Sequence, residues 1–255
     1  MASAPPALAT VELLGMPLVS ARPERFVDHV FAALRSGRGG WVITANVDHL
    51  QRFRDDPGDA PLWRRADVVV PDGVPLLWAA ALQGTPLEHR IAGSDLVWLI
   101  AERAASEGRG LYLLGGDPGA ADAAAARLRE RWPALRIVGT SSPRVSSTPS
   151  DDEVAAVRAG IARARPDVVY VAFGTPKELR LIEALRRDFP AVWWMGVGIS
   201  LSFLGGQVPR APRWMQRIGA EWLHRLAREP RRLGKRYLRN IPFTLWLLAR
   251  CAVRR

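Results

Sequence analysis

Short apolar runs alternate with amphipathic segments along the first 206 residues, and this alternation restricts the fold more than any other feature. The runs are short and rich in β-branched and aromatic residues, which is typical of strands. They lie at Trp41–Thr44, Val68–Val70, Leu111–Leu114, Ile137–Val138, Val168–Phe173 and Val192–Met195. Because the runs are apolar throughout rather than at every second residue, we expect strands that are buried on both faces.

The segments between the runs carry the start and stop signals of helices. Helices are predicted over residues 23–37, 94–107, 120–131 and 150–165. Ser150 and Glu153 form a capping box at the start of the last one. Strands separated by helices form parallel sheets, so the sequence predicts a Rossmann-like α/β body with helices on both faces of the sheet. Residues 141–150 (SSPRVSSTPS) are predicted to form a loop.

Polar or glycine-rich turns follow five of the predicted strands. They read TANVDHL (44–50), VPDGVP (70–75), GGDPG (115–119), GTPKE (174–178) and GVGIS (196–200). Any one of them is explained by the needs of a strand-to-helix turn. In a parallel sheet, however, all five lie at the carboxyl edge, where ligands bind. Gly115 and Gly116 could present backbone N–H groups to a phosphate, although neither a Walker A motif nor a complete G-x-G-x-x-G is present.

Asp72 is the carboxylate of most interest. It follows an apolar strand at the mouth of the sheet, where burial would raise its pKa toward that of a general base. The alternative role is to cap the helix that begins near Val74. The chain has no D-x-D motif and its four His residues show no ligand spacing, so we expect neither a metal nor another cofactor.

The last 49 residues carry the whole net charge of the chain. From Gln207 to Arg255 there are 13 Lys and Arg against two acids, Glu221 and Glu229, and the net charge of the full chain is also +11. Tryptophan, leucine and isoleucine recur at helical spacing among the arginines. Such a basic amphipathic segment suits an anionic lipid surface or a diphosphate better than nucleic acid. We therefore predict a body at 1–206 and a basic helical appendage at 207–255.

The same features give an expected location. The single cysteine, Cys251, allows no intrachain disulfide, the N-terminus does not resemble a secretory signal, and no apolar run approaches the ~20 residues that span a bilayer. We expect a cytoplasmic protein that lies peripherally on the inner face of the plasma membrane. The apolar residues of the tail could equally support self-association.

Several motifs together resemble one enzyme family. They are T-x-N at 44–46, PDG at 71–73, HRIAGSDL at 89–96, LLGGDPG at 113–119, PDVVYVAFGTPK at 166–177, GVG at 196–198, RAP-x-W at 210–214, EWLHRL at 221–226 and EPRR at 229–232. In this order they resemble the WecG/TagA/CpsF glycosyltransferases, glycosyltransferase family 26. The resemblance covers about Val11 to Leu248.

The resemblance implies that the chain is a hexosyltransferase. It implies inverting, metal-independent transfer of a sugar from a UDP-sugar, such as UDP-N-acetylmannosamine or another UDP-hexose or uronic acid. The acceptor would be a sugar linked to undecaprenyl diphosphate, in the synthesis of cell-wall or surface polysaccharide. Asp72 matches the proposed catalytic aspartate, and Thr44 is placed with it as catalytic.

Other positions match substrate-binding segments. Without a metal, cations and backbone dipoles must meet the charge of the leaving diphosphate. The predicted substrate-binding residues are Asn46, Arg90, Gly115, Gly116, Lys177, Glu178, Arg210, Arg225, Arg228, Arg231 and Arg232.

Two positions depart from the family pattern, and two other readings of the chain stay open. Glu178 stands where the family usually has glutamine, and Ser202 where it commonly has aspartate. We interpret these changes as marking a branch with another donor or acceptor.

A nicotinamide-dependent oxidoreductase would need a dinucleotide fingerprint that is missing, and a non-catalytic membrane or nucleic-acid adaptor would leave the PDG and T-x-N segments without a role.

Overall fold

A six-stranded parallel sheet forms the centre of the molecule. The computed structural model describes residues 7–217 and 219–253, apart from the side chains of Arg217 and Arg232. The strand order is β4-β3-β8-β7-β5-β6. Their bounds are β3 Gly40–Ala45, β4 Val68–Pro71, β5 Gly110–Gly115, β6 Arg136–Ser141, β7 Val168–Ala172 and β8 Trp193–Gly196. All six predicted strands are confirmed, and all pairs in this sheet are parallel.

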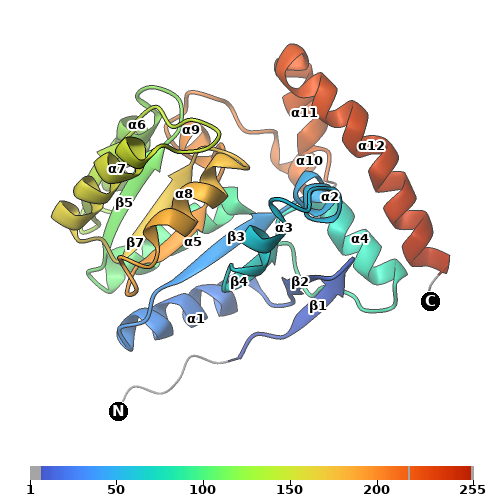
Figure 1. The fold of residues 1–255 in the computed structure, drawn as a ribbon, viewed down its shortest axis with the longest axis horizontal. Helices are drawn as coiled ribbons and strands as arrows, with labels where there is room; N and C mark the ends of the chain where they lie inside the picture. The colour runs from blue at the N-terminus through green and yellow to red at the C-terminus, as the bar shows by residue number, and fades with distance from the viewer. Residues whose placement is uncertain (1–6, 218, 254–255) are drawn as a thin grey trace.

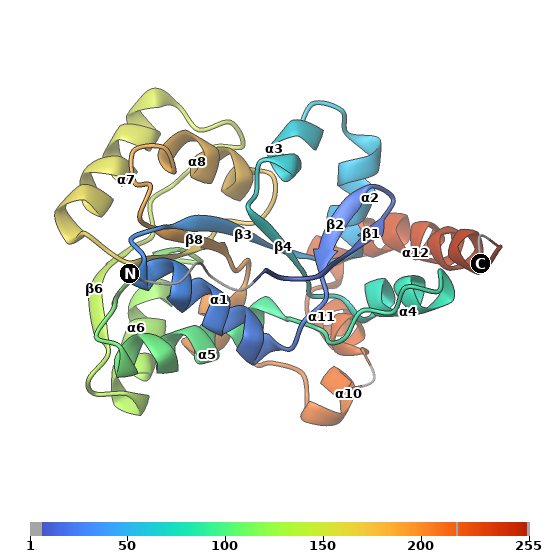
Figure 2. The ribbon, with the colours of Figure 1, turned by 90° about the horizontal axis from the view of Figure 1, so that it is seen from below.

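Helices cover both faces of the sheet, as predicted (Figure 1, Figure 2). One apolar core lies under α1 (Pro23–Arg35), α5 (Gly93–Ser106), α6 (Ala120–Arg131) and α9 (Ser200–Leu204). The other lies under α2 (Val47–Asp55), α3 (Ala60–Arg64), α4 (Val74–Leu82), α7 (Asp151–Ala164) and α8 (Lys177–Leu185). Ser150 and Glu153 form the predicted capping box of α7. The sandwiching of the sheet explains why its strands are apolar throughout.

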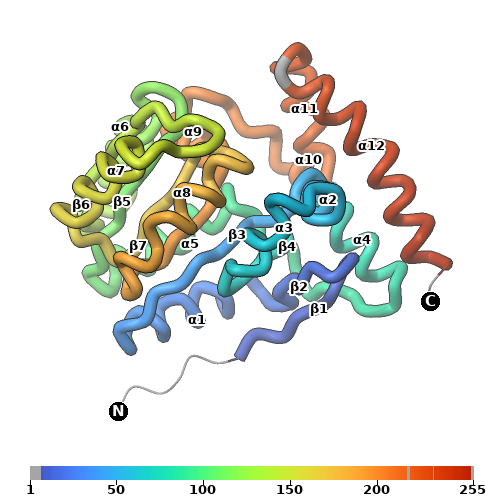
Figure 3. The backbone as a smooth tube through the Cα atoms, viewed as in Figure 1, coloured from blue at the N-terminus to red at the C-terminus, as the bar shows by residue number. Residues whose placement is uncertain are grey.

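An N-terminal hairpin was not predicted. β1 (Thr10–Leu13) pairs antiparallel with β2 (Met16–Val19) and forms a separate two-stranded sheet that lies beside β4 (Figure 3). Leu13, Met16 and Leu18 are fully buried in the second core. The hairpin therefore closes the core at the edge of the large sheet.

The basic tail is helical, as predicted, and packs on the body. It forms α10 (Arg213–Arg217), α11 (Glu221–Arg228) and α12 (Pro230–Val253), and α12 continues through Pro242. α12 lies side by side with α4 and α2 (Figure 1, Figure 2). Its buried side chains Phe243, Leu247 and Cys251 belong to the same core as α2 and α4. Among the described residues, no helix combines the length and apolarity that crossing a bilayer requires.

Candidate active site

A large cavity lies at the carboxyl edge of the sheet. Its volume is about 1110 Å³, and residues from all five predicted turns line it, those at 44–50, 70–75, 115–119, 174–178 and 196–200. The remaining wall comes mainly from α11 and α12, including Arg225 and Arg236. The convergence of the turns is thus confirmed, and the tail contributes directly to the same cavity.

Asp72 lies in this cavity directly after β4. Its N–H donates to the carbonyl of Ala45 (2.7 Å), which fixes the turn. The alternative role as a helix cap is wrong, because Gly73 occupies the N-cap of α4 and no side chain caps that helix. Desolvation raises the pKa of Asp72 to about 6. The charge of Arg90 opposes this rise, and the negative charge of Glu221 adds a smaller increase. A carboxylate with such a pKa is suited to take a proton near neutral pH.

Thr44 and Asn46 lie at the floor of the cavity, where β3 meets α2. The buried Thr44 hydroxyl donates to the carbonyl of Gly196 (2.9 Å), which ties β3 to β8. Because its one proton is used there, Thr44 can meet a ligand as an acceptor. Asn46 is the N-cap of α2 and its Oδ1 accepts from the N–H of His49 (3.2 Å).

An ionic network joins the start of α5 to α11 beside Asp72. Arg210 lies 2.6 Å from Asp95 and 3.2 Å from Glu221, and Arg90 lies 3.6 and 3.7 Å from the same two carboxylates. Arg90 and Glu221 also line the cavity, whereas Arg210 lines a smaller neighbouring one of about 410 Å³. The network fixes α11 over the cavity and balances the acidic groups around Asp72.

Lys177 and Glu178 begin α8 and both line the cavity. The Glu178 side chain is buried, and its Oε2 has no hydrogen-bond partner among the described residues. A Cβ at Gly196 would lie 2.1 Å from Glu178 Oε1, so only glycine leaves room for this carboxyl. Burial raises the pKa of Glu178 to about 7, although backbone N–H groups of Gly198 and Gly174 oppose the rise. Glu178 is thus a second carboxyl of the cavity that titrates near neutral pH.

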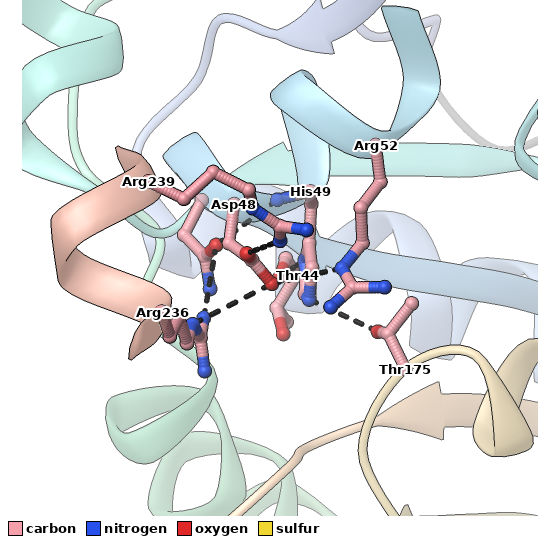
Figure 4. Close-up of polar contacts among 8 residues, drawn as sticks. Thr44, Asp48, His49, Arg52, Thr175, Arg236 and Arg239 are labelled. Atoms are coloured by element: carbon pink, nitrogen blue, oxygen red, sulfur yellow. Dashed lines mark hydrogen bonds and ion pairs between the residues drawn. The ribbon is translucent and has the colours of Figure 1, made fainter. Parts of the chain in front are cut away.

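Asp48 was not predicted as a site residue, yet it organises the wall between α2 and α12 (Figure 4). Its buried carboxylate lies 3.1 Å from Arg52 of its own helix, 2.7 Å from Arg239 and 3.5 Å from Arg236, both of α12. Burial alone would raise the pKa of Asp48, but the charges of Arg236 and then Arg52 hold it below its usual value. One buried acid therefore fastens the tail helix to the body.

His49 is held in a single neutral tautomer beside this cluster (Figure 4). Its Nδ1 lies 3.1 Å from the carbonyl of Thr44 and its Nε2 lies 3.0 Å from the hydroxyl of Thr175. Burial lowers the pKa of His49 to about 4, and the charge of Arg236 adds to this. The ring is therefore neutral at pH 7, with Nδ1–H donating to Thr44 and Nε2 accepting from Thr175. Asp48 and His49 both lie in the TANVDHL turn, where the sequence predicted site roles only for Thr44 and Asn46.

Comparison with known families identifies the chain. Residues 11–255 match the sequence model of the glycosyl transferase WecG/TagA/CpsF family. The chain belongs to this family. The resemblance derived from the motifs is thereby confirmed over nearly the whole length, and the fold described above is that of a glycosyltransferase.

Some of the predicted binding residues of this glycosyltransferase line the cavity, and others do not. Asn46, Arg90, Gly116, Lys177, Glu178 and Arg225 line it, whereas Gly115, Arg210, Arg228 and Arg231 do not. Arg228 and Arg231 are exposed, and the side chain of Arg232 lies outside the described residues. The N–H of Gly116 already donates to the carbonyl of Ala172 (2.8 Å), so this amide is not directed at a ligand. Three lining cations were missed: Arg52, Arg144 and Arg236.

The second departure from the family pattern also lies at the cavity of the glycosyltransferase. Ser202 is buried, lines the cavity, and its hydroxyl donates to Asp117 (3.3 Å). The carboxylate of Asp117, from the GGDPG turn, therefore lies beside the position where the family commonly has an aspartate. Among the described residues, no group of three or more His, Cys, Asp or Glu is arranged to hold a metal ion.

Proposed function

We propose that this glycosyltransferase moves a sugar, with inversion, from a UDP-sugar to a sugar linked to undecaprenyl diphosphate, and needs no metal. The observation that carries the proposal is Asp72, a carboxylate with a pKa of about 6 at the floor of a cavity that also holds several cations. Inversion in one displacement needs a single base that removes the proton from the attacking hydroxyl. In the proposed step, Asp72 takes that proton while the acceptor oxygen bonds to the anomeric carbon and the UDP leaves.

The departing diphosphate needs compensation of charge. Arg52, Arg90, Arg225 and Arg236 line the cavity, and guanidinium groups bind phosphate oxygens in pairs of parallel hydrogen bonds. Preorganised cations of this kind stabilise charge that develops in the transition state. In the proposed mechanism they take the part that a divalent ion has in other glycosyltransferases. Thr44 and Asn46 would position the donor by hydrogen bonds, and Lys177 and Glu178 would bind it from α8.

Peripheral binding to an anionic membrane is part of the proposal. α11 and α12 combine arginines with exposed apolar side chains, among them Trp222, Leu223, Leu238 and Leu245. Such surfaces bind anionic lipid headgroups and the outer part of the acyl region. The lipid-linked acceptor would then reach the cavity from the inner face of the plasma membrane.

A transfer assay tests the proposal. A panel of radiolabelled UDP-sugars is offered with a short-chain polyprenyl-diphosphate-N-acetylglucosamine acceptor in EDTA, and the anomeric configuration of the product is determined by NMR. We expect transfer from one donor, with inversion and without added metal. Protection against thermal unfolding by UDP and not by NAD would separate this activity from an oxidoreductase. If UDP neither binds nor protects, the proposed donor class is wrong.

A further inference from the structure

Glu178 is a buried carboxyl in the wall of the cavity. The residue is 5% exposed, and its Oε2 has no hydrogen-bond partner among the described residues. A buried polar atom without a partner costs free energy, so natural proteins keep few of them. The last torsion of a glutamate side chain is soft, so a small rotation turns either oxygen toward the cavity. The unused oxygen therefore marks a place where a group of a ligand would complete the hydrogen bonding.

The packing around Glu178 places its carboxyl at the end of β8. Gly196 is the last residue of this strand, and a Cβ there would lie 2.1 Å from Glu178 Oε1. The carbonyl of the same glycine accepts the hydrogen bond of the Thr44 hydroxyl (2.9 Å). The carboxyl of Glu178 therefore lies beside the part of the cavity floor that Thr44 forms.

The strand order places Asp72 and Glu178 at opposite sides of this floor. Asp72 follows β4, Thr44 belongs to β3, and Glu178 lies against the end of β8, in the order β4-β3-β8. Two strand spacings separate the two carboxyls by roughly 10 Å, which leaves room for one hexose ring. In the proposed reaction the anomeric carbon lies next to the hydroxyl that Asp72 deprotonates. The far edge of the ring, which carries C4 and C6, then lies toward Glu178.

No cation compensates the carboxyl of Glu178 among the described residues. Burial raises its pKa to about 7, backbone N–H groups oppose the rise, and no charged side chain contributes. Lys177 directly precedes Glu178, but consecutive side chains on a helix do not face each other. A second carboxylate placed against Glu178 would therefore meet an uncompensated negative charge. The other ionisable groups that the turns at the sheet edge bring to the cavity are Asp48, His49, Asp72, Asp117 and Arg144.

We propose that Glu178 selects the donor sugar: its carboxyl bonds a hydroxyl at the far edge of a neutral UDP-hexose and excludes a UDP-hexuronic acid. This inference rests on the proposed function, because it concerns the sugar of the same donor. A hydroxyl can donate to the ionised carboxyl or accept from the protonated one, so a neutral hexose suits both forms. A hexuronic acid carries a carboxylate on C6, which the ionised form repels. Glutamine, which the family usually has at this position, carries no charge and would accept both sugars.

The affinities of the full chain for UDP-glucose and UDP-glucuronic acid test the proposal, because these ligands differ only at C6. They are measured by calorimetry at pH 6 and pH 8. At pH 8 the wild type can hold the uronate only if Glu178 takes up a proton, so it should bind UDP-glucuronic acid about tenfold more weakly than UDP-glucose. At pH 6, where Glu178 is mostly protonated, the two affinities should lie within about threefold.

Two variants separate the role of Glu178 from a general effect of charge. Glu178→Gln should bring the two affinities within about threefold at both pH values, because the group that titrates is gone. Asp188→Asn is the matched control. It removes an equal charge from an exposed ion pair with Arg158 beyond the end of α8, and Asp188 does not line the cavity. This control should keep the wild-type ratio of affinities at pH 6 and pH 8.

Two results would overturn the role of Glu178. One is equal affinity of the wild type for the two ligands at pH 8. The other is a ratio that Glu178→Gln leaves unchanged, because the discrimination would then come from another part of the cavity. UDP is titrated in the same samples. UDP binding without discrimination at C6 would refute only this inference, whereas a lack of UDP binding would refute the proposed donor class and this inference with it.

Discussion

Asp72→Asn should yield a protein that is inactive but more stable than the wild type at neutral pH. The structure holds the Asp72 carboxyl among groups that disfavour its charge, chiefly through desolvation, which raises its pKa from 3.8 to about 6. The wild type therefore gives up free energy of folding to keep an ionised base in the cavity. Asparagine has nearly the same shape and carries no charge, so the substitution removes this cost.

The size and the pH dependence of the gain follow from the pKa. A difference of one pKa unit between the folded and unfolded states corresponds to about 1.4 kcal/mol, so the cost is about 3 kcal/mol at most. Below pH ~4 the carboxyl is protonated in both states and costs nothing. Between the two pKa values the unfolded state ionises first, so the wild type loses stability as the pH rises. Above pH ~6 the cost is constant.

Urea denaturation at pH 8 and pH 5 measures this effect. We expect Asp72→Asn to raise the free energy of unfolding by about 1–3 kcal/mol at pH 8 and by about half as much at pH 5. Asp48→Asn is the control with the opposite sign, because the cations around Asp48 lower its pKa and the ionised form stabilises the fold. A gain for Asp72→Asn that is absent at pH 8, or equal at both pH values, would refute the assignment of a desolvated carboxylate.

Three further predictions concern other residues in and around the cavity. Glu178→Gln should increase stability above pH 7, where the wild-type carboxyl ionises at a cost, and should remove an inflection near pH 7 from the pH–rate profile. Arg210→Ala should leave Asp95 and Glu221 less compensated, and the pH–rate limb that belongs to Asp72 should move to higher pH, whereas Arg210→Lys should move it less. Gly196→Ala should lower the free energy of unfolding by about 1–3 kcal/mol, because its Cβ would clash with Glu178, and the double variant with Glu178→Ala should recover part of the loss in thermal unfolding.

The fold could be predicted because the local signals and the tertiary contacts agree. The six runs are apolar on both faces, and each lies in a strand of one parallel sheet between two helical layers. The hairpin of β1 and β2 was missed because Thr10–Leu13 and Met16–Val19 are short, and their pairing is stabilised by packing at the edge of the sheet. The helix of the tail was expected, but its burial against α2 and α4 depends on long-range contacts of Phe243 and Leu247.

The candidate site could be predicted where residues follow strands directly. Thr44 lies near the end of β3, Asn46 and Asp72 directly follow β3 and β4, and Glu178 lies in the first turn of the helix after β7; all four line the cavity. Asp48 and Arg236 could not be predicted, because they are far apart in the sequence and meet only when α12 packs on α2. Arg210 was predicted from its motif to bind the substrate. In the structure it forms ion pairs with Asp95 and Glu221 and does not line the cavity.

The central claim, that Asp72 is the base of a sugar transfer, is tested most directly by comparing donor binding with transfer in Asp72→Asn. Calorimetry gives the affinity for UDP, and the radiolabel assay gives the rate with the donor that the wild type uses. We predict an affinity within about threefold of the wild type and a rate that falls at least about a hundredfold, since a general base contributes this much or more. Transfer within about tenfold of the wild-type rate would contradict the claim.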